Sequence, residues 1–363
     1  TAPGLVGSLN LNGTSVPGLL GGLEDIDGSV SFDGNRASTQ GLSFRYDGQA
    51  TGRLSGSLTN LQNPQLDFEA RLDRLNLDTL REATGVIKSL QGRGTLRIES
   101  GVMSRLPFTN LSAQARLDRG LWSLSDLNMS TAGGRLSGSV TADLRAANPA
   151  FNGNITFSNA DSNQLAGQLL NFSNQISGES DLNLVFQAQG STTEAFLASL
   201  SGRGSLAVRN GRVSGLDLLG PLFGAVEGQL RGNGSAGGFV GAVRGLNTGK
   251  FAKLGGSFRL EGGNAITDDF VYAASGFQMK VNGSLALIDR SANLRVIGDL
   301  ERSSSNGAIG NFLKLPGGTG LRSFAFEVAG PLYQGSSVRD VRLVDPETGA
   351  SKPSEPGIQG STP

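Results

Sequence analysis

The chain has 363 residues, of which 55 are glycine, and its 31 basic and 31 acidic side chains balance. Without a basic excess it lacks the positive field that binding to a phosphate backbone requires, which argues against nucleic acid as a partner. Cysteine and histidine are both absent, so disulfides, thiolate metal sites and histidine-based catalysis are excluded. We therefore expect a protein that is not an enzyme and that uses no cofactor.

Alternation of apolar and polar residues dominates the first half of the chain. It is already present at Leu5–Leu11, so we expect this chain to be a fragment of a longer protein. The alternating segments that follow are Leu66–Asp73, Leu96–Glu99, Ala113–Leu117, Phe151–Phe157 and Leu182–Ala188. Successive side chains of a strand point to opposite faces, so each segment has one apolar and one polar face. This pattern favours antiparallel strands with one solvated face over a parallel sheet.

The same alternation continues in the second half. It recurs at Leu206–Val208, Phe258–Leu260, Met279–Leu287, Leu294–Val296, Phe324–Val328 and Val338–Val344. Short turns are predicted at Asp33-Gly34-Asn35, Glu99-Ser100-Gly101 and Arg209-Asn210-Gly211, because Gly and Asn tolerate the positive φ of tight hairpins. We expect a meander in which each strand pairs with its neighbour in sequence.

Internal repeats support an array of similar units. The segment 89–96 (SLQGRGTL) matches 199–206 (SLSGRGSL), and 52–58 (GRLSGSL) matches 134–140 (GRLSGSV). Residues 281–285 (VNGSL) form a weaker third copy of the second motif. Repeats with the same strand pattern indicate units that bury their apolar faces beside their neighbours.

Four segments interrupt the β pattern with apolar residues at helical spacing: 76–90, 161–173, 191–200 and 216–231. Asp161 is a predicted N-cap of the second segment. Ser191 and Glu194 have the spacing of a capping box at the start of the third. We expect these helices to cover the apolar face of the sheet at intervals. The segment 346–363 is rich in Pro, Gly and Ser and is predicted to be disordered.

Motifs with possible chemistry are weak. The glycine-rich segments 232–237 and 245–251 lack the strand, helix and Ser/Thr context of dinucleotide and phosphate loops, so both are interpreted as turns. Asp25 with Asp27, and Asp268 with Asp269, have no calcium-binding loop around them and are interpreted as solvated carboxylates. No cluster of catalytic residue types emerges.

The second half of the chain resembles the C-terminal region of the AsmA-like family. The resembling run begins with 200–218 (LSGRGSLAVRNGRVSGLDL) and continues through 251–263 (FAKLGGSFRLEGG) to 265–270 and 279–289 (MKVNGSLALID). The order of a Gly-x-Gly strand, an Asn-Gly turn, a helix and a closing Gly-Ser-Leu strand carries the resemblance over residues 190–345. Residues 1–190 share only the alternating pattern.

This resemblance implies a mainly β protein, an elongated and curved antiparallel β-sheet groove of repeating meander units with a few short covering helices. It implies an upstream repeat region at 1–190 and an AsmA-like region at 191–345. It further implies a periplasmic protein of the Gram-negative envelope, anchored to the inner membrane by an N-terminal segment missing here. A bridge-like groove would support phospholipid transport and outer-membrane biogenesis, with phospholipid acyl chains, bacterial membranes and outer-membrane assembly proteins as partners.

The apolar sheet face has two interpretations, a packed core or an open groove for acyl chains. In the groove interpretation the lipid-lining residues are Phe68, Ile98, Phe157, Val208, Leu260, Leu287, Val296 and Phe326. Two other functions stay open. One is a structural or adhesive β-repeat protein with a filled core. The other is a TamB-like assembly factor that binds outer-membrane protein precursors along a sheet edge.

Overall fold

The computed structural model describes residues 5–16, 23–46, 50–60, 63–76, 91–103, 105–170, 176–213, 250–274, 277–300, 323–331 and 337–343. These residues contain 18 strands and two short helices. The fold is mainly β, as predicted. The chain divides into two compact units, unit 1 (1–208 and 259–264) and unit 2 (209–258 and 265–363), with the division falling within β12 (Ser201–Val213) and β13 (Lys250–Glu261).

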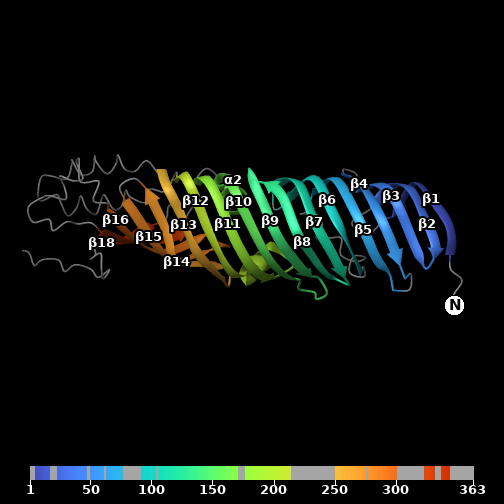
Figure 1. Cartoon of the computed structure of the whole chain (residues 1–363). Coiled ribbons are helices and arrows are strands. Elements are labelled where there is room, and N and C mark those ends of the chain that lie inside the picture. Colours follow the sequence, from blue (N-terminus) through green and yellow to red (C-terminus); the bar gives the residue numbers. More distant parts are fainter. Residues whose placement is uncertain are drawn as a thin grey trace, which may run out of the picture. The chain divides into compact units, whose positions relative to one another are not determined.

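Unit 1 is built from a series of long strands that lie side by side in chain order (Figure 1). They are β1 (Leu5–Val16), β2 (Leu23–Gly34), β3 (Arg36–Tyr46), β4 (Ala50–Thr59), β5 (Gln65–Asn76), β6 (Gln91–Met103), β7 (Leu106–Asp118), β8 (Leu121–Thr131), β9 (Gly134–Asp143), β10 (Ala150–Asp161) and β11 (Ile176–Gln189). The boundary predicted between residues 190 and 191 was drawn from the sequence alone. The strands of unit 1 do not test it, so it stays a prediction.

Strand pairing in unit 1 follows the predicted meander with one exception. From β1 to β11 each strand pairs with the next along the chain, and all of these pairs but one are antiparallel. The exception is the pair β5–β6, which is parallel, with Phe68 opposite Gly94 and Leu72 opposite Ile98. A parallel pair needs a crossover of about a dozen residues or more, and residues 77–90 supply that length. The expectation of a purely antiparallel sheet was therefore wrong at this point.

Unit 2 has the same strand pattern. Beside the remaining parts of β12 and β13 it contains β14 (Asn264–Ala274), β15 (Phe277–Ala286), β16 (Ser291–Leu300), β17 (Ser323–Pro331) and β18 (Ser337–Leu343). The pairs β15–β16, β16–β17 and β17–β18 are antiparallel. The predicted alternating segments of this half all fall on these strands, except that Leu287 lies in the turn after β15 and Val344 lies outside the described residues.

Two of the four predicted helices are present, α2 (Ser162–Leu170) and α3 (Thr193–Ser199). Asp161 caps α2 as predicted, because its Oδ1 accepts from the backbone N–H groups of Asn163 and Gln164 at 2.8 and 3.0 Å. The cap of α3 is Thr192, not Ser191, since Thr192 Oγ1 accepts from the backbone of Ala195.

The predicted helices at 76–90 and 216–231 fall, apart from residue 76 at the end of β5, outside the described residues, as does the tail 346–363. Neither α2 nor α3 has the length and hydropathy of a membrane-spanning helix, and the described part of the chain holds no other candidate.

Two predicted turns lie inside strands. Asp33-Gly34-Asn35 does form the hairpin between β2 and β3, but Glu99-Ser100-Gly101 lies within β6 and Arg209-Asn210-Gly211 within β12. Asn210 has φ +50°, the conformation expected of an Asn-Gly turn, without reversing the chain. Such residues are typical of β-bulges, which bend a strand and shift its alternation by one residue. In β7, with Asn110 at φ +54°, the buried positions accordingly change from even to odd numbers between Phe108 and Leu111.

The sequence repeat 52–58/134–140 is also a structural repeat. Gly56 of β4, Gly138 of β9 and Gly283 of β15 occupy its Gly-Ser position, and all three have φ between +133° and +155°. At Gly138 an added Cβ would lie 2.0 Å from the carbonyl oxygen of Asn154 on the paired strand. Glycine is required there both for the backbone conformation and for the close approach of β10.

Candidate functional site

The apolar face of unit 1 is continuous from β4 to β11, because residues directly opposite in register share a face. One row shows this: it passes through Gly56, Phe68, Gly94, Ala115, Leu124, Val140, Gly153 and Phe186. Along each strand, the residues that alternate with those of the apolar face are mostly charged or hydroxylated and point to the other, polar face.

One part of this face is a packed core, the buried zone, beside the bulges. Its members are between 1 and 5% exposed: Ile98, Leu106, Phe108, Leu111, Met129, Leu136 and Phe157. The helix α2 packs here, with Leu165 in the same cluster and contacts to β7, β10 and β11. The guanidinium of Arg105 donates to the carbonyl of Gln168 at 3.2 Å, which fixes the last turn of α2 to the start of β7.

A second part, the half-exposed strip, lies toward the opposite ends of the same strands. Its members are neither buried nor fully exposed: Leu58, Leu66, Phe68, Leu117, Trp122, Leu124, Val140, Phe151 and Phe186. Leu124 and Val140 also pack against the core cluster, so the strip adjoins the buried zone at these two residues. Leu58 faces Leu66, and Leu117 faces Trp122, so the strip crosses the strands from row to row. It is an apolar surface that water reaches, with the polar side chains of the same strands turned away from it.

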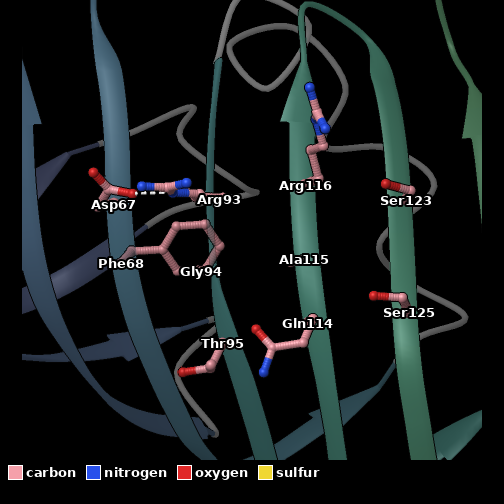
Figure 2. A pocket seen from close by; sticks show the side chains of 10 residues that line it. All are labelled: Asp67, Phe68, Arg93, Gly94, Thr95, Gln114, Ala115, Arg116, Ser123 and Ser125. Carbon is pink, nitrogen blue, oxygen red and sulfur yellow. Dashed lines mark hydrogen bonds and ion pairs between the residues drawn. The ribbon is translucent and has the colours of Figure 1, made fainter.

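Phenylalanine rings lie over cross-strand glycines on this face. A Cβ added to Gly94 would meet the ring of Phe68 at 2.6 Å, and Figure 2 shows that ring reaching across to Gly94. Gly153 is related to Phe186 in the same way, as are Gly52 to Phe44 and Gly101 to Phe108. Because a glycine leaves room for the neighbouring ring, the rings lie close to the sheet. The apolar surface is therefore low and smooth at these positions.

The helix α3 covers one end of the half-exposed strip. Its Phe196 packs edge-on against Phe151 and Phe186, with ring centroids 5.6 and 6.1 Å apart. Ser199 at the end of the helix accepts a hydrogen bond from the backbone N–H of Gln189 at 2.7 Å, which ties α3 to β11. The strip is thus closed by an aromatic cluster at β10 and β11.

The polar face carries cross-strand ion pairs. A cleft of about 440 Å³ lies there, and in it Arg93 Nε donates to Asp67 Oδ1 at 2.8 Å. Figure 2 shows the side chains that line this cleft. On the same face the hydrogen bond from Arg71 lowers the pKa of Glu69. These groups are exposed to water, so such pairs contribute little to stability.

The carboxylates considered for calcium have other partners. Asp25 forms an ion pair with Arg45, and Asp27 accepts from the backbone of Gly13 at 2.9 Å. In unit 2, Asp269 accepts from the hydroxyl and backbone N–H of Ser257, and these bonds lower its pKa. Within the described residues no group of three or more acidic side chains is placed to hold a metal ion.

The structure distributes the predicted lining residues over both zones and both units. In unit 1, Phe68 belongs to the half-exposed strip and Ile98 and Phe157 to the buried zone, while Val208 and Leu260 are 1 and 4% exposed. In unit 2, Leu287 is half-buried, Val296 is buried, and Phe326 lies opposite Val296 in the register of β16 and β17. Their role in lining a groove stays a prediction.

Sequence reasoning missed most of the strip. Leu117, Trp122 and Leu124 were not among the predicted lining residues, although their alternation with polar neighbours was visible. The exposure of these side chains depends on which other elements cover the face. That coverage follows from how the strands pair, and the alternation within a single strand does not reveal the pairing. The Phe–Gly pairs depend on the register in the same way.

Comparison with known proteins identifies the family. The model of the AsmA family matches residues 26–270. No curated protein and no solved structure gave a match. The resemblance in the sequence pointed to this family, but the matched range lies further toward the N-terminus than residues 190–345, because the repeating strand pattern of the first half is itself part of the match. Since the match spans well over half of the chain, the protein belongs to the AsmA family.

Proposed function

We propose that this chain is a non-enzymatic, periplasmic protein that supports phospholipid transport between the inner and outer membranes. The observation that carries the proposal is the half-exposed strip, an apolar surface that continues in register from β4 to β11. Membership of the AsmA family supports it, because the family is one of envelope proteins. Anchoring to the inner membrane belongs to the same proposal.

The strip would hold acyl chains by removing them from water. Each buried methylene contributes about 0.8 kcal/mol, and this interaction is non-directional. A chain lying across the strands would meet similar apolar side chains at every strand, so it could move along without crossing a polar barrier. The rings packed over glycine, such as Phe68 over Gly94, would keep this path smooth.

The predicted lining residues have distinct parts in this proposal. Phe68 would contact lipid directly, together with Leu117 and Leu124 of the strip. Ile98 and Phe157 would support the strip from the buried zone, since they are almost inaccessible to water. Val208 and Leu260 in unit 1, and Leu287, Val296 and Phe326 in unit 2, would extend the apolar face within their own units.

The test compares the apolar face of the paired strands β7 and β8 with the polar face of β8. Leu117→Asp with Leu124→Asp charges the strip, whereas Ser123→Asp with Ser125→Asp adds the same charge to the polar face of β8. We expect native mass spectrometry of protein isolated from bacterial envelopes without detergent to show phospholipid on the wild type and the polar-face variant, and none on the strip variant. Circular dichroism checks that both variants fold. Undiminished phospholipid on a folded strip variant would refute the strip as the lipid site. A wild type that carries no phospholipid would favour a structural protein with a filled core.

A second candidate function is favoured by β1. Leu5, Val6 and Leu9 of this strand are 62, 83 and 52% exposed, an unusual exposure for large apolar side chains. An extended segment of an outer-membrane protein precursor could cover them by adding a strand, as in a TamB-like assembly factor. Cross-linking from Val6 to unfolded barrel precursors would support this function, and cross-linking only to lipid would count against it.

A further inference from the structure

Three arginines face one another on the polar side of the sheet. Arg53 of β4 lies directly opposite Arg71 of β5, and Arg71 lies opposite Arg97 of β6. Like charges that are directly opposite on neighbouring strands repel and lower stability. The nearby pair of Asp67 and Arg93 shows that the same strands also place opposite charges together. The arginine row is therefore a local concentration of like charge on the polar face.

The carboxylates near the row are largely engaged elsewhere. Arg71 donates to Glu69 at 2.7 Å. Asp73 accepts from the backbone N–H of Thr51 at 2.7 Å, while Asp25 and Asp27 have the partners described above. Glu99 also lines the same cleft, in which the four carboxylates Asp25, Asp27, Asp73 and Glu99 equal the four arginines Arg45, Arg53, Arg71 and Arg97 in number. Besides Arg71, Arg97 helps to lower the pKa of Glu69 by its charge. Within the described residues neither Arg53 nor Arg97 forms an ion pair, so two guanidinium groups flank Arg71 with donors that no carboxylate accepts.

The row has polar ends and lies in a cleft. Ser43 of β3 faces Arg53, and Ser112 of β7 faces Arg97, so five donor side chains stand in line across five strands. The cleft that they line, together with Arg45 and Asn110, has a volume of about 900 Å³. At a strand spacing of about 4.8 Å the row is roughly 19 Å long, which is space for more than one small oxyanion.

We propose that Arg53, Arg71 and Arg97 form a binding site for phosphate groups on the polar face of unit 1. Guanidinium groups bind phosphate oxygens through two parallel hydrogen bonds, and a bound dianion removes the repulsion within the row. The phosphate can belong to a lipid headgroup or to a soluble phosphate compound, because both present the same oxygens. The site lies on the face opposite the half-exposed strip. The proposed phosphate site and the proposed acyl-chain path can therefore be tested independently of each other.

The test uses a double variant with a matched control. Arg53→Gln with Arg97→Gln removes the two free guanidinium groups, and Arg135→Gln with Arg203→Gln removes the same charge from exposed arginines on β9 and β12. Binding of inorganic phosphate and pyrophosphate to the whole chain is measured by calorimetry at two salt concentrations. Binding of vesicles is measured by flotation, with phosphatidylglycerol or phosphatidylcholine alone as the lipid.

We expect the row variant to bind at least about tenfold more weakly, the loss of about one charge-assisted interaction, and the control to match the wild type. Binding of the inorganic probes identifies a site that takes soluble phosphate. Binding only of phosphatidylglycerol vesicles identifies a lipid headgroup. Equal binding by the wild type and the row variant, or no binding of any probe, overturns the proposal.

A second measurement separates binding from a structural role. Without ligand the row variant should melt at the same temperature as the wild type or higher, because its substitutions remove repulsion. A lower melting temperature would assign the row to the stability of the sheet and would also overturn the proposal.

Discussion

The buried zone and the half-exposed strip of unit 1 are built from the same strands and the same residue types, yet only the first is closed to water. Phe108 and Phe68 illustrate the contrast, since each ring lies over a cross-strand glycine, but Phe108 is 2% exposed and Phe68 is half-buried. The difference comes from what lies above the face. Bulges bend the strands and α2 covers one part, whereas α3 covers only the end of the other.

Truncating Phe108 and Phe68 should give the largest difference in the free energy of unfolding. Phe108→Ala should lower the free energy of unfolding by about 3–5 kcal/mol, because it opens a cavity in a packed core. Phe68→Ala should lower it by about half as much or less, since water already reaches that ring. Denaturation in guanidinium chloride measures both. Equal losses would mean that the strip is packed as tightly as the core.

Two glycines of similar φ test how closely the strands approach one another. Gly138→Ala should destabilise the protein by about 1–3 kcal/mol more than Gly7→Ala. Their φ values are +149° at Gly7 and +145° at Gly138, but a Cβ at Gly138 would collide with the carbonyl of Asn154, while at Gly7 nothing lies within 4 Å. Thermal melting of the two variants measures the difference. Indistinguishable melting temperatures would show that β10 can move away from β9 without loss.

Replacing two buried serines near α2 should give the smallest changes in stability, and the two changes should have opposite signs. The hydroxyl of Ser180 is buried without a hydrogen-bond partner among the described residues, so Ser180→Ala should stabilise the protein by up to about 1 kcal/mol. Ser162 donates to the carbonyl of Gly178 at 2.8 Å, so Ser162→Ala should destabilise it by about 1 kcal/mol. Urea denaturation measures both. Destabilisation by Ser180→Ala would indicate that its hydroxyl has a partner.

The sequence predicted the elements of this fold better than their connections. The alternation along Leu66–Asp73 identified β5, and the capping residue Asp161 identified the start of α2, because both signals are local. The parallel pairing of β5 with β6 could not be predicted, since it depends on where the chain returns after residue 76. Asn210-Gly211 was predicted as a turn because bulges and hairpins use the same positive φ.

The candidate site could be predicted only in outline. The existence of an apolar face followed from alternation, and Phe68 lies on that face, while its role in lining a groove stays a prediction. Which part of the face is open depends on α2 and α3, whose positions are set by contacts distant in sequence, such as that between Arg105 and Gln168. The arginine row has the same origin, because Arg53, Arg71 and Arg97 become neighbours only through the register.

The parallel pair of β5 and β6 has a consequence for the order of folding. An antiparallel strand can close onto its predecessor from a nearby turn as soon as it leaves the ribosome, so most of unit 1 can assemble one strand at a time. β6 cannot begin in this way, because residues 77–90 must first be brought back across the length of β5 and the closure of that loop opposes pairing. We therefore expect β1–β5 and β6–β11 to form as separate cooperative segments that join last at this pair, and to exchange their amide hydrogens as two groups.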